Sequence, residues 1–159
     1  MVLLLKNLLF TFIIPGTVGV YIPLFIARHR SPATGAVGAA ALVSLGAGGA
    51  IYAWCVWDFA TFGRGTPVPL DAPKRLVVRG LYRYVRNPMY LGVLTVILGW
   101  VVLFQTRGLA IYMLVLPLYF HLMVVCYEEP HLRRLFGKEY GDYCDQVGRW
   151  LPRLRRPSA

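Results

Sequence analysis

The chain has 159 residues, of which 57% are hydrophobic and 15% are charged, and its formal net charge is +10. The mean hydropathy of +0.56 and the low charged fraction exclude an ordinary soluble domain of this length. A strongly basic chain can bind nucleic acid. Here, however, the basic residues fall where a membrane protein carries them, so we predict no direct contact with nucleic acid.

Four apolar stretches are long enough, or nearly so, to cross a bilayer, which takes roughly 20 residues. They run from Val2 to Ala27, Gly35 to Trp57, Pro88 to Phe104 and Leu109 to Tyr127. The first stretch has no small-residue cleavage site, so we expect a retained helix rather than a signal peptide, kinked at Pro15 and Pro23. We therefore predict an all-α polytopic membrane protein with about four transmembrane helices plus amphipathic C-terminal helices.

The charged residues gather on one side of these spans. With four crossings, the amino terminus, the loop from Asp58 to Asn87 and the carboxyl-terminal tail share one membrane face. That face carries 14 of the 17 basic residues and all seven acids. By the positive-inside rule we expect both termini and the active site to be cytoplasmic, with the basic residues near anionic lipid headgroups.

We expect a single membrane domain over residues 1–159. It divides into the first two spans (1–57), a cytosolic loop (58–87), a helical hairpin (88–127) and a cytosolic tail (128–159). The connection Gln105–Gly108 is short enough to force the hairpin, so Tyr90 and Glu128 return to the same side. The second span is rich in Gly and Ala, which favours close packing against another helix or a second protomer. A substrate groove along this face is the alternative.

Local signals define the cytosolic side further. Asn87 and Pro88 fit the start of the third span, as the N-cap and the first helical residue. Residues 62–73 contain glycines and prolines that prevent a regular helix. The cysteines are isolated, so we predict no metal site and no disulfide. Apolar residues of the tail recur with helical spacing and predict amphipathic helices at the membrane surface: Leu132, Leu135, Phe136, Tyr140, Tyr143 and Val147.

Two polar clusters flank the predicted hairpin. One runs from Arg79 to Tyr90 and the other is Tyr127-Glu128-Glu129. Polar groups at membrane depth are costly, so such clusters indicate a functional site. Carboxylates, aromatic faces and a helix start suit a cationic, amphipathic small molecule with an anionic end. No Ser-His-Asp arrangement or Gly-rich phosphate loop is evident, so hydrolysis and phosphoryl transfer are poorly supported.

Several segments, taken in order and spacing, resemble the C-terminal half of the isoprenylcysteine carboxyl methyltransferase and phospholipid methyltransferase superfamily. These are integral membrane enzymes that use S-adenosylmethionine. The resemblance covers Lys74 to Pro152 and lies in these segments: Lys74-Arg75-Leu76-Val77, Gly80-Leu81-Tyr82, Arg86-Asn87-Pro88-Met89-Tyr90, Glu128-Glu129 and Phe136-Gly137-Lys138-Glu139-Tyr140. It implies methyl transfer from S-adenosylmethionine to a lipophilic acceptor, such as a phospholipid amine or a hydrophobic thiol or carboxylate. The cofactor contacts that it implies are Lys74, Arg75, Leu76, Val77, Tyr82, Asn87, Pro88, Met89, Tyr90 and Glu128.

Two positions depart from the family pattern. Asn87 stands where the family has a His, which keeps hydrogen-bonding capacity but removes a titratable group. Val124 stands where prenylcysteine enzymes carry an Arg for the substrate carboxylate. The missing Arg favours an amine or a neutral acceptor.

The candidate catalytic residues are Glu129, His121 and Arg86. Glu129 would support Glu128 or accept a proton from an amine, and His121 would line the acceptor cavity. Arg86 adjoins Asn87, and it is the functional candidate among the arginines of this cluster. We interpret the other arginines as anchors that follow the positive-inside rule. The structural alternatives are carboxylates that only reach the interface and a packed His121.

Two other functions compete with the methyltransferase. One is a nicotinamide-dependent membrane reductase of related architecture, and the other is a non-catalytic membrane scaffold. The identity of the acceptor and the oligomeric state stay open at this point.

Overall fold

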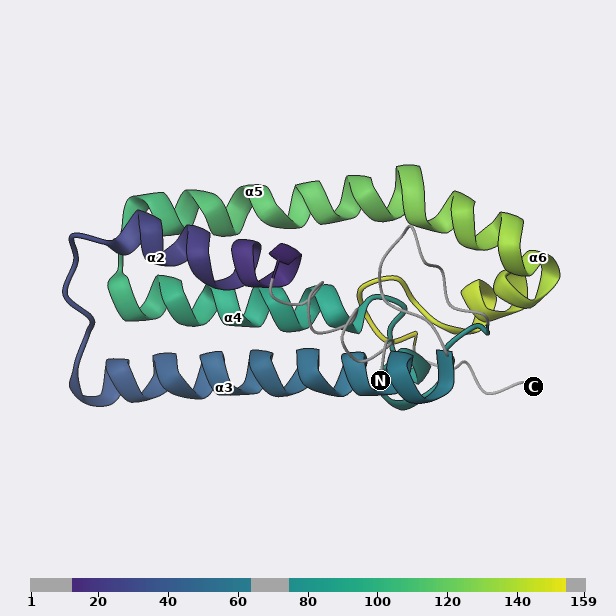
Figure 1. Ribbon diagram of the computed structural model, residues 1–159, viewed down its shortest axis with the longest axis horizontal. Helices are drawn as coiled ribbons and strands as arrows, with labels where there is room; N and C mark the ends of the chain where they lie inside the picture. The colour runs from purple at the N-terminus through teal and green to yellow at the C-terminus, as the bar shows by residue number, and fades with distance from the viewer. Residues whose placement is uncertain (1–12, 64–74, 154–159) are drawn as a thin grey trace.

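A computed structural model of the chain describes residues 13–63 and 75–153. Over these ranges the named elements are all helical, which confirms the all-α prediction. In chain order they are η1 (Thr17–Tyr21), α2 (Ile22–Ala27), α3 (Gly35–Asp58), η2 (Phe59–Gly63), η3 (Gly80–Arg83), α4 (Pro88–Phe104), α5 (Arg107–Met123), η4 (Val124–Glu128) and α6 (Glu129–Gln146). Helices α2 to α5 run along the long axis of the molecule, and α6 turns away at one end (Figure 1).

Two helical stretches are long and apolar enough to cross a membrane, Gly35–Phe62 and Arg107–Gln146. Two shorter apolar helices, Ile13–Ala27 and Pro88–Phe104, accompany them; the predicted beginning of the first span, from Val2, lies outside the described residues. Large apolar side chains are exposed on α3 and α5, for example Val43 at 72% and Leu114 at 77%. Apolar helices of this kind, with apolar outer surfaces, are typical of a membrane protein.

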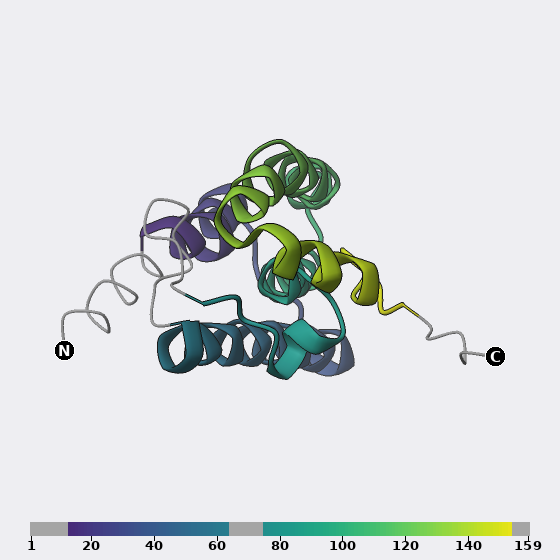
Figure 2. The same cartoon turned by 90° about the vertical axis from the view of Figure 1, so that its right-hand side faces the viewer.

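The Gly- and Ala-rich face of α3 packs against α4, so the prediction of close helix packing is confirmed. A Cβ placed on Gly48 would lie 2.6 Å from the carbonyl oxygen of Gly92 and 2.6 Å from the amide nitrogen of Val96. The Ser44 hydroxyl donates to the carbonyl of Thr95 at 2.8 Å. Because only glycine permits this approach, α3 and α4 form the tightest contact of the bundle. Figure 2 shows α4 lying between α3 and α5 when the bundle is viewed from its end.

The N-terminal helix contains a π-helical turn, η1, between the two prolines at which we expected kinks. Pro23 has no amide hydrogen, so it cannot donate to the carbonyls that lie four and five residues before it in the helix. The Tyr112 hydroxyl of α5 donates to the carbonyl of Val18 at 2.9 Å, and the Trp100 indole of α4 donates to the carbonyl of Gly19 at 2.8 Å. These side chains therefore satisfy the freed carbonyls and fix this segment to the hairpin.

The hairpin of α4 and α5 is confirmed. Gln105 adopts a left-handed conformation with φ of 49°, and the Thr106 side chain caps α5 by accepting from the amide of Leu109 at 3.2 Å. After α5, the chain continues through η4 into α6, where Gly137 has φ of 50° and divides the helix into two arms. The tail is helical, as predicted, and most of its apolar residues join a buried cluster: Tyr140, Tyr143, Cys144 and Val147, with Leu76, Leu132 and Phe136 packed against it. Leu135, which the helical spacing placed on the same face, is 50% exposed.

Candidate functional site

The two polar clusters meet at the open end of the hairpin. Tyr90, on the first turn of α4, donates a hydrogen bond through its hydroxyl to Oε1 of Glu128, at the end of η4. The Tyr90 ring packs on Phe120 of α5 with 4.5 Å between centroids. Residues that are 38 positions apart in the sequence are thus in direct contact, as the hairpin predicted.

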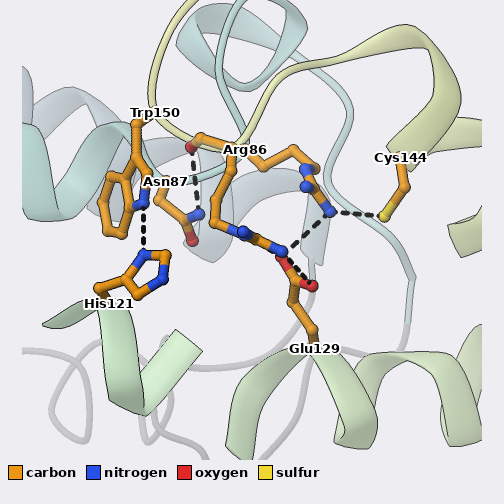
Figure 3. Close-up of polar contacts among 7 residues, drawn as sticks. Arg86, Asn87, His121, Glu129, Cys144 and Trp150 are labelled. Carbon is orange, nitrogen blue, oxygen red and sulfur yellow. Dashed lines mark hydrogen bonds and ion pairs between the residues drawn. The ribbon is translucent and has the colours of Figure 1, made fainter. Parts of the chain in front are cut away.

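Glu128 and Glu129 are adjacent in the sequence but have different partners. The π turn of η4 ends at Glu128, and π turns often mark functional positions. Glu128 accepts its hydrogen bond from Tyr90. Glu129 is only 8% exposed, and its carboxylate forms a two-point ion pair with Arg149. Nε of Arg149 lies 2.6 Å from Oε1 and Nη2 lies 2.9 Å from Oε2. Nη1 of Arg86 lies 3.2 Å from Oε1, so two guanidinium groups hold this carboxylate (Figure 3).

Glu128 and Glu129 follow the apolar part of the α5 helix. Their surroundings shift the pKa values of the two carboxyl groups in opposite directions. Burial raises the pKa of Glu128, the hydrogen bond from Tyr90 opposes that rise and the charge of Glu129 adds to it. Burial also acts to raise the pKa of Glu129, but the Arg149 hydrogen bond and the charges of Arg86, Arg149 and Arg133 together bring it below its ordinary value. Such a split between neighbouring carboxyl groups is a feature of sites that separate a proton-binding group from a permanently charged one.

Arg86 joins the site to the tail. Besides Glu129, its Nη1 contacts Sγ of Cys144 at 2.6 Å, and its backbone amide donates to the carbonyl of Gly148 at 2.8 Å. Among the described residues its buried Nε has no hydrogen-bond partner. A buried guanidinium nitrogen without an acceptor is costly, so Arg86 retains a donor that a bound anion can use.

Asn87 occupies the N-cap position and α4 begins at Pro88, as predicted. Its side chain, however, does not cap the helix; Nδ2 donates instead to the carbonyl of Arg149 at 3.2 Å. The reason is the backbone of Asn87, whose φ of −126° and ψ of 53° lie outside the usual N-cap conformation. Asn87, which stands where the family has a His, therefore binds the segment that follows α6 through the carbonyl of Arg149.

Tyr82 is one of the buried members of the first cluster, because only 7% of it is exposed. Its side chain forms a hydrogen bond with Cys55 of α3, and burial raises its pKa well above the ordinary value. Its carbonyl accepts a hydrogen bond from the Tyr143 hydroxyl at 2.8 Å. Tyr82 thus connects α3, the loop and α6.

The remaining predicted contacts are spread around this junction. Lys74 lies outside the described residues. Arg75 is exposed, whereas Pro88 and Val77 are buried. Leu76 packs against the buried cluster of α6, and Val77 packs with Cys55 and Tyr82 in a second cluster that Met89 also contacts. The segment 75–77 therefore lies between α3 and α6.

Sequence reasoning missed Arg149, Trp150 and Asp58. The Trp150 indole donates to Nδ1 of His121 at 3.1 Å and lies edge-on to Tyr90 with 6.2 Å between ring centroids. Asp58, at the end of α3, is 3% exposed, and within the described part of the chain its Oδ2 has no hydrogen-bond partner. A signal existed only for the first two residues: Gly148, just before them, makes a turn so tight that a Cβ would clash with the carbonyl of Leu151.

Known proteins resemble part of this chain. The family model for phospholipid methyltransferases matches residues 36–139, so the match begins within α3 and extends further toward the amino terminus than the motifs did. Methanethiol S-methyltransferase from Pseudomonas deceptionensis is 38% identical over 88 residues, 55% of this chain and 32% of that protein. Probable protein-S-isoprenylcysteine O-methyltransferases from two subspecies of Oryza sativa, indica and japonica, are each 37% identical over 79 residues, 49% of this chain and 41% of theirs.

These matches span less than half the length of the curated relatives. No solved structure matches the chain. The family match, in contrast, covers more than half of the 159 residues and includes Tyr90, Glu128 and Glu129. The chain belongs to the phospholipid methyltransferase family.

Proposed function

We propose that this protein is an integral membrane enzyme that transfers a methyl group from S-adenosylmethionine to a lipophilic acceptor. The observation that carries the proposal is the hydrogen bond between Tyr90 and Glu128. It joins two of the motif segments on which the family resemblance rests, and it lies inside the region that the family model matches. Two separate parts of the chain thus converge where a shared ligand would contact both.

The residues at this junction fit the chemistry of S-adenosylmethionine, which carries an ammonium, a carboxylate, a sulfonium and ribose hydroxyls. Glu128 would accept from the ribose hydroxyls or the ammonium, and the aromatic ring of Tyr90 would face the sulfonium. The unpartnered Nε of Arg86 would donate to the carboxylate. The remaining proposed contacts are those that the motifs predict: Lys74, Arg75, Leu76, Val77, Tyr82, Asn87, Pro88 and Met89.

When bound, S-adenosylmethionine would supply an activated methyl group. A lone pair of the acceptor would form the new bond to this methyl carbon, while the electron pair of the broken carbon–sulfur bond would stay on sulfur. The protein therefore has mainly to position the reactants and exclude water. An amine acceptor also releases a proton, and Glu128, with its raised pKa, is the better of the two carboxylates to receive it. We assign Glu129 to positioning, because Arg149 and Arg86 already hold both of its oxygens.

We further propose that the single domain crosses the membrane four times, with both termini and the site on the cytoplasmic side. The shorter apolar helices Ile13–Ala27 and Pro88–Phe104 lie beside the two long ones, which supports four crossings. The exposed apolar surface of α5 then gives a membrane-dissolved acceptor lateral access. A phospholipid amine, or a hydrophobic thiol or carboxylate, is the acceptor class that this arrangement supports.

Calorimetry on the purified protein in detergent micelles tests the proposal. S-adenosylhomocysteine, the stable product, should bind the wild type, and Glu128→Gln should lose that binding. The matched control is Glu139→Gln, which removes an exposed carboxylate of α6 and should bind as the wild type does. Saturable binding of NADPH in place of S-adenosylhomocysteine, or binding of neither, would contradict the proposal in favour of a reductase or a scaffold, respectively.

A further inference from the structure

His121 is a polar side chain on an otherwise apolar surface. It lies on α5, is exposed, and has as neighbours along the helix the exposed residues Leu118 at 61% and Leu122 at 51%. In a membrane helix an imidazole at such a position is costly and indicates a function by default. The proposed transfer of a methyl group does not by itself require it.

Trp150 determines which hydrogen-bonding role is open to His121. An indole nitrogen is only a donor, and it donates to Nδ1 of His121 at 3.1 Å. An imidazole nitrogen that accepts a hydrogen bond carries no proton, so the single proton of the neutral ring lies on Nε2. His121 therefore presents an N–H donor on the side of its ring away from Trp150, rather than a free basic nitrogen.

The Trp150 side chain is fixed in place by its neighbours. The preceding residue, Arg149, forms the two-point ion pair with Glu129, and its carbonyl accepts from Asn87. On its other side, the Trp150 ring meets Tyr90 edge-on. Figure 3 shows Trp150 and His121 side by side, with Asn87 next to them and Glu129 beyond. Trp150 thus links the His121 ring to Tyr90 and holds it at the apolar edge of the site.

We propose that His121, oriented by Trp150, is a positioning residue that donates a hydrogen bond from Nε2 to an anionic oxygen in the headgroup of the acceptor. The inference rests on the proposed function and narrows its substrate class. The acceptor is a membrane amphiphile with a phosphate or carboxylate near the reacting atom, rather than a plain alkyl thiol. A neutral imidazole on α5 also provides a donor one helical turn before Val124, the first residue of η4, whose side chain has none.

Kinetics with three acceptors in vesicles test this assignment. They are dioleoylphosphatidylethanolamine, which has a phosphate, N-acetyl-S-farnesylcysteine, which has a carboxylate, and decanethiol, which has neither. His121→Phe should raise KM for an acceptor with an anionic oxygen about tenfold more than it raises KM for decanethiol, the effect of one such hydrogen bond. His121→Gln keeps an N–H donor and should restore KM. Whichever of the first two acceptors responds identifies phosphate or carboxylate as the oxygen source.

If His121→Phe has the wild-type KM for each of the three acceptors, the inference is overturned. It is also overturned if KM for decanethiol rises as much as KM for the acceptors with an anionic oxygen. Affinity for S-adenosylhomocysteine should stay at the wild-type value in both variants. If the wild type itself does not bind S-adenosylhomocysteine, the proposed function fails, which is a separate result.

A measurement that needs no activity tests the role of Trp150. Nitrogen-15 NMR of histidine-labelled protein should show His121 neutral with its proton on Nε2, and Trp150→Phe should relax this preference. The chain has only three histidines, so His121→Gln assigns the signal. A proton on Nδ1 in the wild type would overturn the inference.

Discussion

Replacing Glu129 with Gln tests whether the ion pair with Arg149 organises the site. The carboxylate is 8% exposed and receives two hydrogen bonds from Arg149 and one close contact from Arg86. Gln retains one acceptor oxygen, but its amide group places a donor opposite an Arg149 donor. The change therefore removes the charge that compensates two guanidinium groups and weakens the attachment of Trp150.

Removing one partner of a fully buried ion pair costs about 3–5 kcal/mol. The Arg149 side chain is 32% exposed, so water partly replaces the lost partner, and we expect a loss of about 2 kcal/mol in the free energy of unfolding. For a chain of this length each kcal/mol lowers Tm by roughly 2–4 °C. Glu129→Gln should thus lower Tm by about 4–8 °C.

Thermal unfolding in detergent, followed by circular dichroism, measures this shift against Glu139→Gln as the exposed control. A Tm for Glu129→Gln within 1 °C of that control, on the order of measurement error, would refute the reasoning. The double change Glu129→Gln with Arg149→Met should cost less than the sum of the single changes, because the two residues act as a pair.

The remaining predictions concern pH, packing and hydrogen bonding. Because the folded-state pKa of Glu129 lies below its ordinary value, its contribution to stability is present above the ordinary pKa and is lost as pH falls through the folded one. Glu129→Gln should therefore flatten the acid limb of a Tm–pH profile, and an unchanged limb contradicts this. Gly48→Ala should lower Tm, because the added Cβ pushes α3 away from α4. Gly49→Ala should leave Tm unchanged, because there is open space around its Cβ position. Equal Tm values for the two variants would disprove the close contact. Tyr143→Phe removes a buried hydrogen bond and should cost about 1 kcal/mol in urea unfolding, whereas exposed Tyr84→Phe should cost nothing measurable.

The parts of the fold that follow from local patterns were predictable. The short connection at Gln105 dictated the hairpin, and the hairpin brought Tyr90 to Glu128. The Gly-rich face of the second span implied a close partner, which is α4. The period of apolar residues in the tail likewise indicated the helix α6. In each case the relevant information lies within a few residues, or follows from one short connection.

The parts that depend on irregular backbone were not predictable. Glu128 and Glu129 bind different partners at the end of the π turn η4, and no periodicity of side chains signals such a turn. Gly137 redirects α6, and Gly148 then returns Arg149 and Trp150 to α4. Their contacts with Glu129 and His121 therefore depend on two glycine conformations and on tertiary packing. The burial of Asp58 at the end of α3 had no sequence signal either.

The junction of Tyr90 and Glu128 is the proposed binding site of S-adenosylmethionine. Calorimetric titration of S-adenosylhomocysteine into the wild type and Tyr90→Phe tests it most directly, with Tyr119→Phe as the exposed tyrosine control on α5. We predict saturable binding to the wild type and to Tyr119→Phe, and an affinity about tenfold lower for Tyr90→Phe, because the phenol hydroxyl that fixes Glu128 is gone. Wild-type affinity in Tyr90→Phe, or no binding of S-adenosylhomocysteine to the wild type, would contradict the claim.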